Sequence, residues 1–270
     1  MTDISFALNH MSAPQLPLPA FFDLAQKLGT RAVEIRNDLA GNAILDGTPP
    51  DDIRKLSEDR GLTILSINAL QRFNEWTTER EEEAKALAGY ARDCGARALV
   101  LVPVNDGSGR VDGERQASLR KALKGLQPIL ADAGIGGLVE PLGFPICSLR
   151  SKREAVEAIN ELGFGASFRL VHDTFHHHLA GESELYPAQT GLVHISGVTD
   201  KVIGVDEMLD AHRVLVDDED RLGNIGQIRT LREQGYTGFF SFEPFASSVQ
   251  ELSDPAEALA QSIAFIRAGI

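Results

Sequence analysis

In the second half of the chain stands Phe168-Arg-Leu-Val-His-Asp173-Thr-Phe-His-His-His178. Its first five residues form a short, mostly apolar run, which is typical of a buried strand in a parallel sheet. An acid, Asp173, follows this run at once, and an acid in that place commonly caps a helix or a turn. The stretch therefore predicts one β-α unit with a metal-competent side chain at the C-terminal end of its strand.

The same pattern recurs on both sides of this stretch. Short apolar or β-branched runs predict seven further strands, at 4–8, 32–35, 63–68, 98–102, 137–140, 191–195 and 239–243. Helical patterns lie between them, at 20–28, 51–60, 77–94, 114–133 and 155–162, and a last helix follows Asp254-Pro255. A capping box, Ser151-Lys-Arg-Glu154, precedes the fifth of these helices.

Strands that alternate with helices indicate parallel β-α-β units. Eight such units in 270 residues favour an α/β fold, a closed (β/α)8 TIM barrel that occupies residues 1–270 as a single domain. A doubly wound open sheet is the alternative, and the absence of Gly-x-Gly-x-x-Gly after the first strand weakens its dinucleotide-binding version.

Composition narrows the classes of function. The formal net charge is −13 and no dense cluster of Lys and Arg occurs, so a nucleic-acid partner is not expected. Cys94 and Cys147 form no Cys-x-x-Cys motif, and free thiols in a reducing cytoplasm are the simpler interpretation. Neither a signal peptide at the first ten residues nor a membrane-spanning apolar run is evident, so we expect a cytoplasmic protein without a membrane partner.

Four residues that can bind metals stand at the ends of four predicted strands: Glu140, Asp173, His194 and Glu243. The C-terminal ends of barrel strands meet on one face, where barrel enzymes have their active sites. Taken singly, each acid could be a helix cap; together, three carboxylates and an imidazole suit one divalent ion such as Mn2+, Mg2+, Co2+ or Zn2+.

Further polar residues stand near the same strand ends. His176 is expected to contact substrate or to orient a ligand, whereas His172 alternates with Asp173 and should face the surrounding helices. Donors and acceptors for a polyol substrate are expected from Asn9, Glu34, Arg36 and Asn68, although each could equally satisfy loop backbone.

At this point the chain resembles the xylose isomerase-like TIM-barrel superfamily, and within it the inosose isomerases. The motifs that carry the resemblance are Glu34-Ile-Arg36, Asn68-Ala-Leu70 with Phe73-Asn74, Glu140 with Gly143-x-Pro145-x-Cys147, Asp173-x-Phe-His-x-His178, His194-Ile195 and Ser241-x-Glu243-x-Phe245. The resemblance implies the same four metal ligands, with Glu140 and Glu243 also acting as the acid–base pair.

The chain departs from many of these relatives at two places. Ser196 stands where they have an Asp two residues after the ligand His, and no Arg-Pro-Gly-x-Gly turn occurs. Arg213, which precedes Val-Leu-Val-Asp-Asp, is the candidate for their substrate-binding arginine. Barrels of this type often associate with copies of themselves, which leaves a homo-oligomer open.

The resemblance implies a metal-dependent isomerase that moves a proton in a polyhydroxylated ketone, an inosose, through an enediolate. A ketose 3-epimerase, a hydroxypyruvate isomerase or a dehydratase would use the same site and intermediate. More distant alternatives are an endonuclease IV-like repair enzyme, which the acidic composition disfavours, and a sugar-binding barrel without catalysis.

Overall fold

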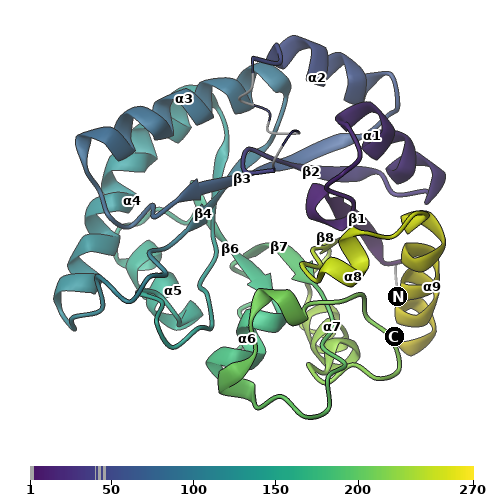
Figure 1. The fold of residues 1–270 in the computed structure, drawn as a ribbon. Helices are drawn as coiled ribbons and strands as arrows, with labels where there is room; N and C mark the ends of the chain where they lie inside the picture. Colours follow the sequence, from purple (N-terminus) through teal and green to yellow (C-terminus); the bar gives the residue numbers. More distant parts are fainter. Residues whose placement is uncertain (1–2, 40, 42–43, 45–46) are drawn as a thin grey trace.

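Eight parallel strands close into a barrel in which each strand pairs with the next and β8 pairs with β1 (Figure 1). The computed structural model describes residues 3–39, 41, 44 and 47–270. Its strands are β1 Ser5–Asn9, β2 Ala32–Arg36, β3 Thr63–Gln71, β4 Ala98–Val102, β5 Gly136–Val139, β6 Phe168–Asp173, β7 Thr190–Ile195 and β8 Phe239–Phe242. The predicted (β/α)8 barrel is confirmed, and the closed strand order rules out the open sheet.

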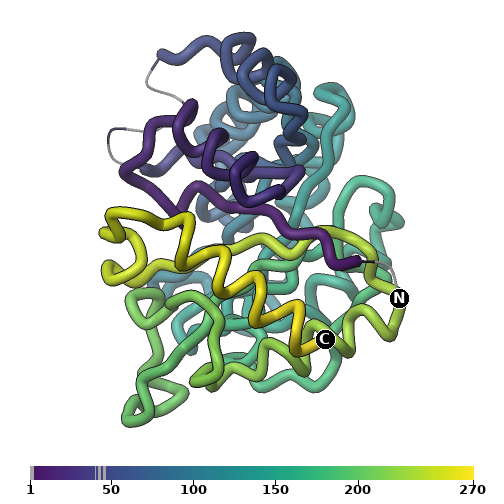
Figure 2. The backbone as a smooth tube through the Cα atoms, turned by 90° about the vertical axis from the view of Figure 1, so that its right-hand side faces the viewer, coloured from purple at the N-terminus to yellow at the C-terminus, as the bar shows by residue number. Residues whose placement is uncertain are grey.

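Helices surround the barrel on its outside (Figures 1 and 2). They are α1 Leu18–Lys27, α2 Pro50–Glu58, α3 Thr78–Cys94, α4 Glu114–Ala133, α5 Lys152–Glu161, α6 Thr174–Ala180, α7 Asn224–Glu233, α8 Ser247–Gln250 and α9 Pro255–Gly269, with 3-10 turns η1 His10–Ser12, η2 Val205–Glu207 and η3 Asp210–His212. No helix of the described residues is both long and apolar enough to cross a bilayer.

The strands separate two parts of the apolar core, and a third cluster, which includes Phe144 and Phe175, lies apart from both. Between strands and helices lies the larger part, to which α4 contributes the predicted stripe of Leu119, Leu123, Leu126 and Leu130. Inside the barrel lies a smaller cluster of Ala7, Ala32, Leu65, Ala69, Ala98, Val100, Leu138, Val171 and Leu192. Alternation along each strand separates the two, because successive side chains point to opposite faces.

This alternation also determines which candidate site residues point to the C-terminal mouth of the barrel. The residue two positions after the last interior residue of a strand also points inward, and its side chain lies at the C-terminal mouth of the barrel. Glu140 follows Leu138 in this way, Asp173 follows Val171, and His194 follows Leu192. The out-of-phase neighbour His172 instead contacts helices, as predicted: its ring nitrogens lie 2.9 Å from Lys152 Nζ on α5 and 2.9 Å from Gln227 Oε1 on α7.

One glycine brings the loop after β5 against α6. A Cβ on Gly143 would collide with the backbone oxygen of His176 and lie 2.6 Å from Cβ of Leu179. Only a residue without a side chain lets the two segments approach this closely. Gly143 therefore helps to fix where His176 stands relative to Glu140.

Candidate metal centre

Four side chains converge at the C-terminal mouth of the barrel. One possible ligand atom from each of Glu140, Asp173, His194 and Glu243 lies within 4.8 Å of the others, and all four residues are buried. They come from the ends of β5, β6, β7 and β8, which pair in that order. The structure thus brings together the four residues that the strand pattern singled out; their role as metal ligands stays a prediction.

His194 stands at the middle of this cluster. Its Nδ1 lies 3.0 Å from Oε1 of Glu140, 3.1 Å from Oε2 of Glu243 and 4.0 Å from Oδ2 of Asp173. Burial alone would lower the pKa of His194, but the charges of Glu243, Glu34 and Glu140 outweigh it and raise that pKa well above its ordinary value. The surrounding carboxylates therefore favour the protonated form of this imidazole.

Glu34 holds the other side of the imidazole. The Nε2 of His194 lies 3.1 Å from Oε1 and 3.2 Å from Oε2 of this carboxylate, which is fully buried. Its remaining lone pairs accept hydrogen bonds from Ser66 Oγ at 2.6 Å, Ser241 Oγ at 2.5 Å, Asn68 Nδ2 at 3.0 Å and Asn9 Nδ2 at 3.4 Å. A carboxylate that fixes the far nitrogen of a histidine is a common support for a metal-binding imidazole.

Asp173 has one oxygen committed to the fold and one turned to the centre. Oδ1 caps α6 by accepting from the backbone N–H groups of Phe175 at 2.8 Å and His176 at 3.0 Å. Oδ2 accepts from Nη2 of Arg213 at 2.6 Å and faces His194. The cap fixes the carboxylate, because rotating it would break two hydrogen bonds.

Glu140 and Glu243 differ sharply in their electrostatic surroundings. Burial raises the pKa of Glu140, and the charges of Glu243 and Asp173 add to the effect despite the opposing charge of His194. Burial would raise the pKa of Glu243 too, but His194, Arg213 and Arg36 lower it below its ordinary value. Glu140 is thus the carboxyl that takes up a proton more readily.

Two buried arginines link the centre to its surroundings. Nη1 of Arg36 donates to Glu243 at 2.8 Å, and Nη2 of Arg213 donates to Glu243 at 3.0 Å. The guanidinium of Arg213 also lies 4.6 Å from the ring centroid of Phe245. At the position where many relatives have an Asp, Ser196 accepts from Nε of Arg213 at 3.0 Å. Arg213 therefore reaches the centre without the missing turn.

A pocket of about 220 Å³ opens above the centre. Among its walls are the predicted residues Arg36, Asn68, Glu140, His176, Arg213 and Glu243, together with Asp38, Gln71, Asn105 and Asp210, which the sequence did not single out. Asn9 and Glu34 are not part of these walls. We expected both to contact substrate; they lie behind the centre instead, where Glu34 contacts the imidazole of His194.

Two polar atoms at this pocket have no partner within the protein. Nδ1 of His176 and Oδ1 of Asn105 are both buried without a hydrogen bond. Buried polar groups are normally paired, so these two residues of the pocket wall are candidates for contact with a ligand. His177, by contrast, turns away and contacts Lys152 Nζ at 2.8 Å.

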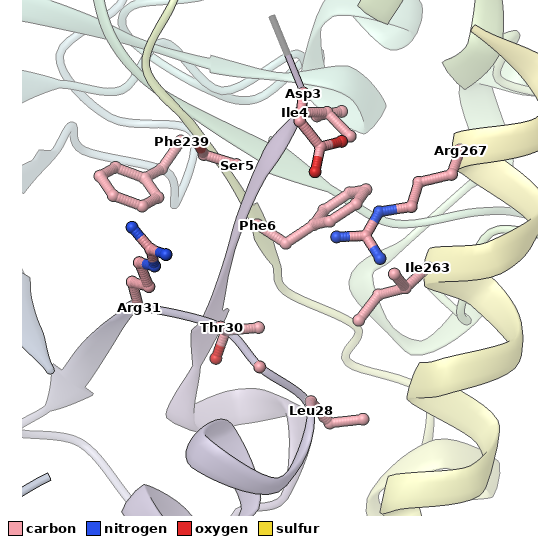
Figure 3. A pocket seen from close by; sticks show the side chains of 11 residues that line it. Asp3, Ile4, Ser5, Phe6, Leu28, Thr30, Arg31, Phe239, Ile263 and Arg267 are labelled. Atoms are coloured by element: carbon pink, nitrogen blue, oxygen red, sulfur yellow. The ribbon is translucent and has the colours of Figure 1, made fainter. Parts of the chain in front are cut away.

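A larger cavity, about 400 Å³, lies at the opposite end of the barrel, where β1 and β8 begin (Figure 3). Figure 3 shows Arg267 reaching from α9 towards Phe6 on one side of β1, with Arg31 beside Phe239 on the other. The cavity is remote from the metal-competent cluster and contains no histidine. The N-terminal face of a barrel contributes to stability rather than to catalysis.

Comparisons with known proteins agree with this architecture. Residues 22–269 match the family described as "Xylose isomerase-like TIM barrel". An inosose isomerase from Halalkalibacterium halodurans is 26% identical over 249 residues, which cover 86% of this chain and 84% of that protein.

Two solved structures are similar over nearly their whole length. A xylose isomerase domain containing protein from Salmonella typhimurium LT2 is 35% identical, with a TM-score of 0.91 and coverage of 98% of this chain and 99% of that one. The IOLI protein with a bound zinc atom is 22% identical, with a TM-score of 0.85 and coverage of 97% and 96%. At that identity the second likeness concerns the fold.

Proposed function

Since the chain belongs to the xylose isomerase-like TIM barrel family, we propose that it is a divalent-metal-dependent isomerase of a polyhydroxylated ketone, with an inosose as substrate. One observation carries the proposal: three carboxylates and an imidazole present ligand atoms within 4.8 Å of one another at the catalytic face of the barrel. The inosose isomerase relative supports the substrate class.

The residues of this centre fit a divalent ion. Oxygen and imidazole ligands suit hard or borderline cations, and Glu34 supports the imidazole from behind. Burial raises the pKa of Glu140, and the charges of Glu243 and Asp173 add to this effect; a bound cation would offset both. When bound, the ion would polarise the ketone oxygen and stabilise negative charge on the enediolate.

The proton transfer itself belongs to the protein's carboxylates. One of Glu140 and Glu243 removes a proton from the hydroxyl-bearing carbon beside the ketone. The proton of that carbon's hydroxyl passes to the former ketone oxygen, and the former ketone carbon takes up a proton from a carboxyl. The ketone thereby moves by one position, with no external oxidant or reductant. Both carboxyls line the pocket, and Glu140, whose pKa burial raises, is the better proton carrier of the two.

The other pocket residues position the ring. The unpartnered Nδ1 of His176 and Oδ1 of Asn105 are the first candidates to bind hydroxyl groups, and Asn68 also lines the pocket. The pocket volume of about 220 Å³ is smaller than that of typical pockets for drug-sized ligands, and it suits a small ring.

Incubation with scyllo-inosose in D2O, followed by NMR, tests the proposal. Isomerisation puts deuterium on a ring carbon and moves the ketone to its neighbour. Epimerisation would place deuterium with the ketone unmoved, and dehydration would produce an alkene signal. Exchange with a ketohexose but with no inosose would overturn the inosose assignment in favour of a 3-epimerase.

A further inference from the structure

Both arginines of the substrate pocket are already bound to acids at its entrance. Nε and Nη2 of Arg36 donate to the two carboxylate oxygens of Asp38, at 2.7 and 2.8 Å. Nη1 of Arg213 donates to Asp210 at 3.1 Å. The arginine side chains are 6% and 2% exposed, whereas those of Asp38 and Asp210 are 36% and 44% exposed, so the acids are the outer members of each pair.

We propose that Asp38 and Asp210 restrict this site to uncharged polyhydroxylated ketones, because they occupy the guanidinium groups that an anionic substrate would need. The inference rests on the proposed function and makes its substrate class narrower. It also predicts which residues set that restriction.

The donor count of each arginine supports this. A guanidinium has five N–H donors, and recognition of a carboxylate or phosphate uses two of them side by side. Besides the bonds to Asp38, Nη1 of Arg36 donates to Asn9 at 3.3 Å and to Glu243 at 2.8 Å. One donor is left, which is enough for a hydroxyl group but too few for a two-pronged contact with an anion.

Arg213 is engaged to the same degree. Besides the bond to Asp210, its Nε donates to Ser196, and its Nη2 donates to Asp173 at 2.6 Å and to Glu243 at 3.0 Å. Again four of the five donors have partners within the protein. Neither arginine therefore offers the pocket two adjacent N–H donors that are free.

The charge of the pocket walls adds little to this. Among the lining residues that the structure describes, four carboxylates, Asp38, Glu140, Asp210 and Glu243, face two guanidinium groups, and there is no lysine. A divalent ion bound at the centre would offset the two surplus negative charges, so the occupied donors rather than the net charge set the restriction. The anionic substrates of a hydroxypyruvate isomerase or a dehydroshikimate dehydratase are thereby disfavoured.

A matched pair of small ligands tests the inference: dihydroxyacetone and hydroxypyruvate, which share the hydroxyketone group and differ in one carboxylate. Dissociation constants are measured by calorimetry on the metal-loaded protein, for wild type, Asp38→Asn, Asp210→Asn and Glu161→Gln. The last variant removes an acid from an arginine pair on the helical surface and controls for the change in net charge.

We expect wild type to favour dihydroxyacetone, and each Asn variant to shift the ratio of the two constants towards hydroxypyruvate by about tenfold, because it removes the charge that holds the arginine. Asp38→Asn should show the larger shift, because it also leaves Arg36 with one acceptor in place of two. Glu161→Gln should leave the ratio unchanged. Equal affinity of wild type for both ligands, or unchanged ratios in whichever Asn variant folds, would overturn the inference. Conversion of scyllo-inosose is assayed separately, so a failure of the proposed function is distinguishable.

Discussion

Glu140 and Glu243 share one pocket wall, yet the two carboxyls are stabilised in opposite ways. Glu140 has a raised pKa among other acids, while Glu243 is held ionised by His194 and two arginines. For both, replacement by Gln should lower kcat by about two to four orders of magnitude, the usual loss when an acid–base group is removed. Steady-state kinetics with metal analysis of each variant checks this; a Gln variant with metal bound and near-normal kcat contradicts it.

The same two variants should differ in stability. Without metal, Glu243→Gln leaves Arg36 and Arg213 with less buried negative charge and should lower the free energy of unfolding by about 3 kcal/mol or more. Glu140→Gln removes a repelling charge and should lower it much less. Urea unfolding in the presence of EDTA measures both. Equal losses of unfolding free energy in the two variants would show that Glu140 and Glu243 do not differ in their electrostatic surroundings as described.

We expect Glu34 to act through His194, whose Nε2 lies 3.1 Å from it, rather than on the substrate. Glu34→Gln should weaken metal binding by about tenfold to a hundredfold, since the imidazole loses the carboxylate that orients it. Activity should recover at saturating metal, which a substrate-contacting residue would not show. Glu161→Gln is the matched control, and an unchanged metal affinity in Glu34→Gln would refute this role.

At the scale of residues, the sequence was enough to identify the four candidate metal ligands, but not the contacts that these and neighbouring side chains make. The positions of Glu140, Asp173, His194 and Glu243 follow from strand ends and alternation, both of which are local patterns. The contacts of Glu34 with Ser66, Ser241 and His194 join β2, β3, β7 and β8 across the barrel. Such contacts depend on how the strands close, so the sequence alone suggested a substrate contact for Glu34.

Among the elements, strands were predicted within a few residues of their observed bounds, because buried parallel strands are continuous apolar runs. Short helices were harder to predict from the sequence than strands. The expectations did not include α7 Asn224–Glu233 or α8 Ser247–Gln250. The first buries only Asn224, Ile228 and Leu231, and the second only Val249. An apolar stripe this sparse does not stand out from a loop.

Lys152 joins three elements and was not foreseen as more than part of a capping box. Its Nζ lies 2.9 Å from Nδ1 of His172 on β6 and 2.8 Å from Nδ1 of His177 on α6. Burial lowers the pKa of Lys152 to about 7, against the opposing charges of Glu182 and Asp173. This lysine sits at the start of α5, behind the strand end that carries Asp173.

The buried lysine should make stability depend on pH. Between the folded pKa of about 7 and the ordinary value of 10.5, the unfolded chain binds more protons, so stability rises with pH in this window. We expect wild type to gain stability relative to Lys152→Met from pH 7.5 to 9, by up to about 1.4 kcal/mol per pH unit. Urea unfolding at each pH measures the difference. A constant difference would mean that Lys152 titrates normally.

At the scale of the whole molecule, closure of the barrel brings strand ends that are far apart in the sequence together into one site. Its closed strand order places β5 to β8 side by side, and the mouth collects their last inward residues. Length and alternation sufficed to predict this architecture. The acid partners Asp38 and Asp210 escaped prediction because Asp38 lies in the loop after β2 and Asp210 in the three-residue turn η3. The course of such short segments over the mouth follows from no periodic pattern.

The central claim is that the C-terminal mouth holds one divalent ion through Glu140, Asp173, His194 and Glu243. Elemental analysis of purified wild type, Asp173→Ala and His194→Ala, each exchanged into Mn2+, Co2+ or Zn2+ and then desalted, tests it most directly. The account predicts about one ion per chain in wild type and a loss of the ion in both variants. An equal metal content in all three proteins, or no retained ion in folded wild type, would contradict it.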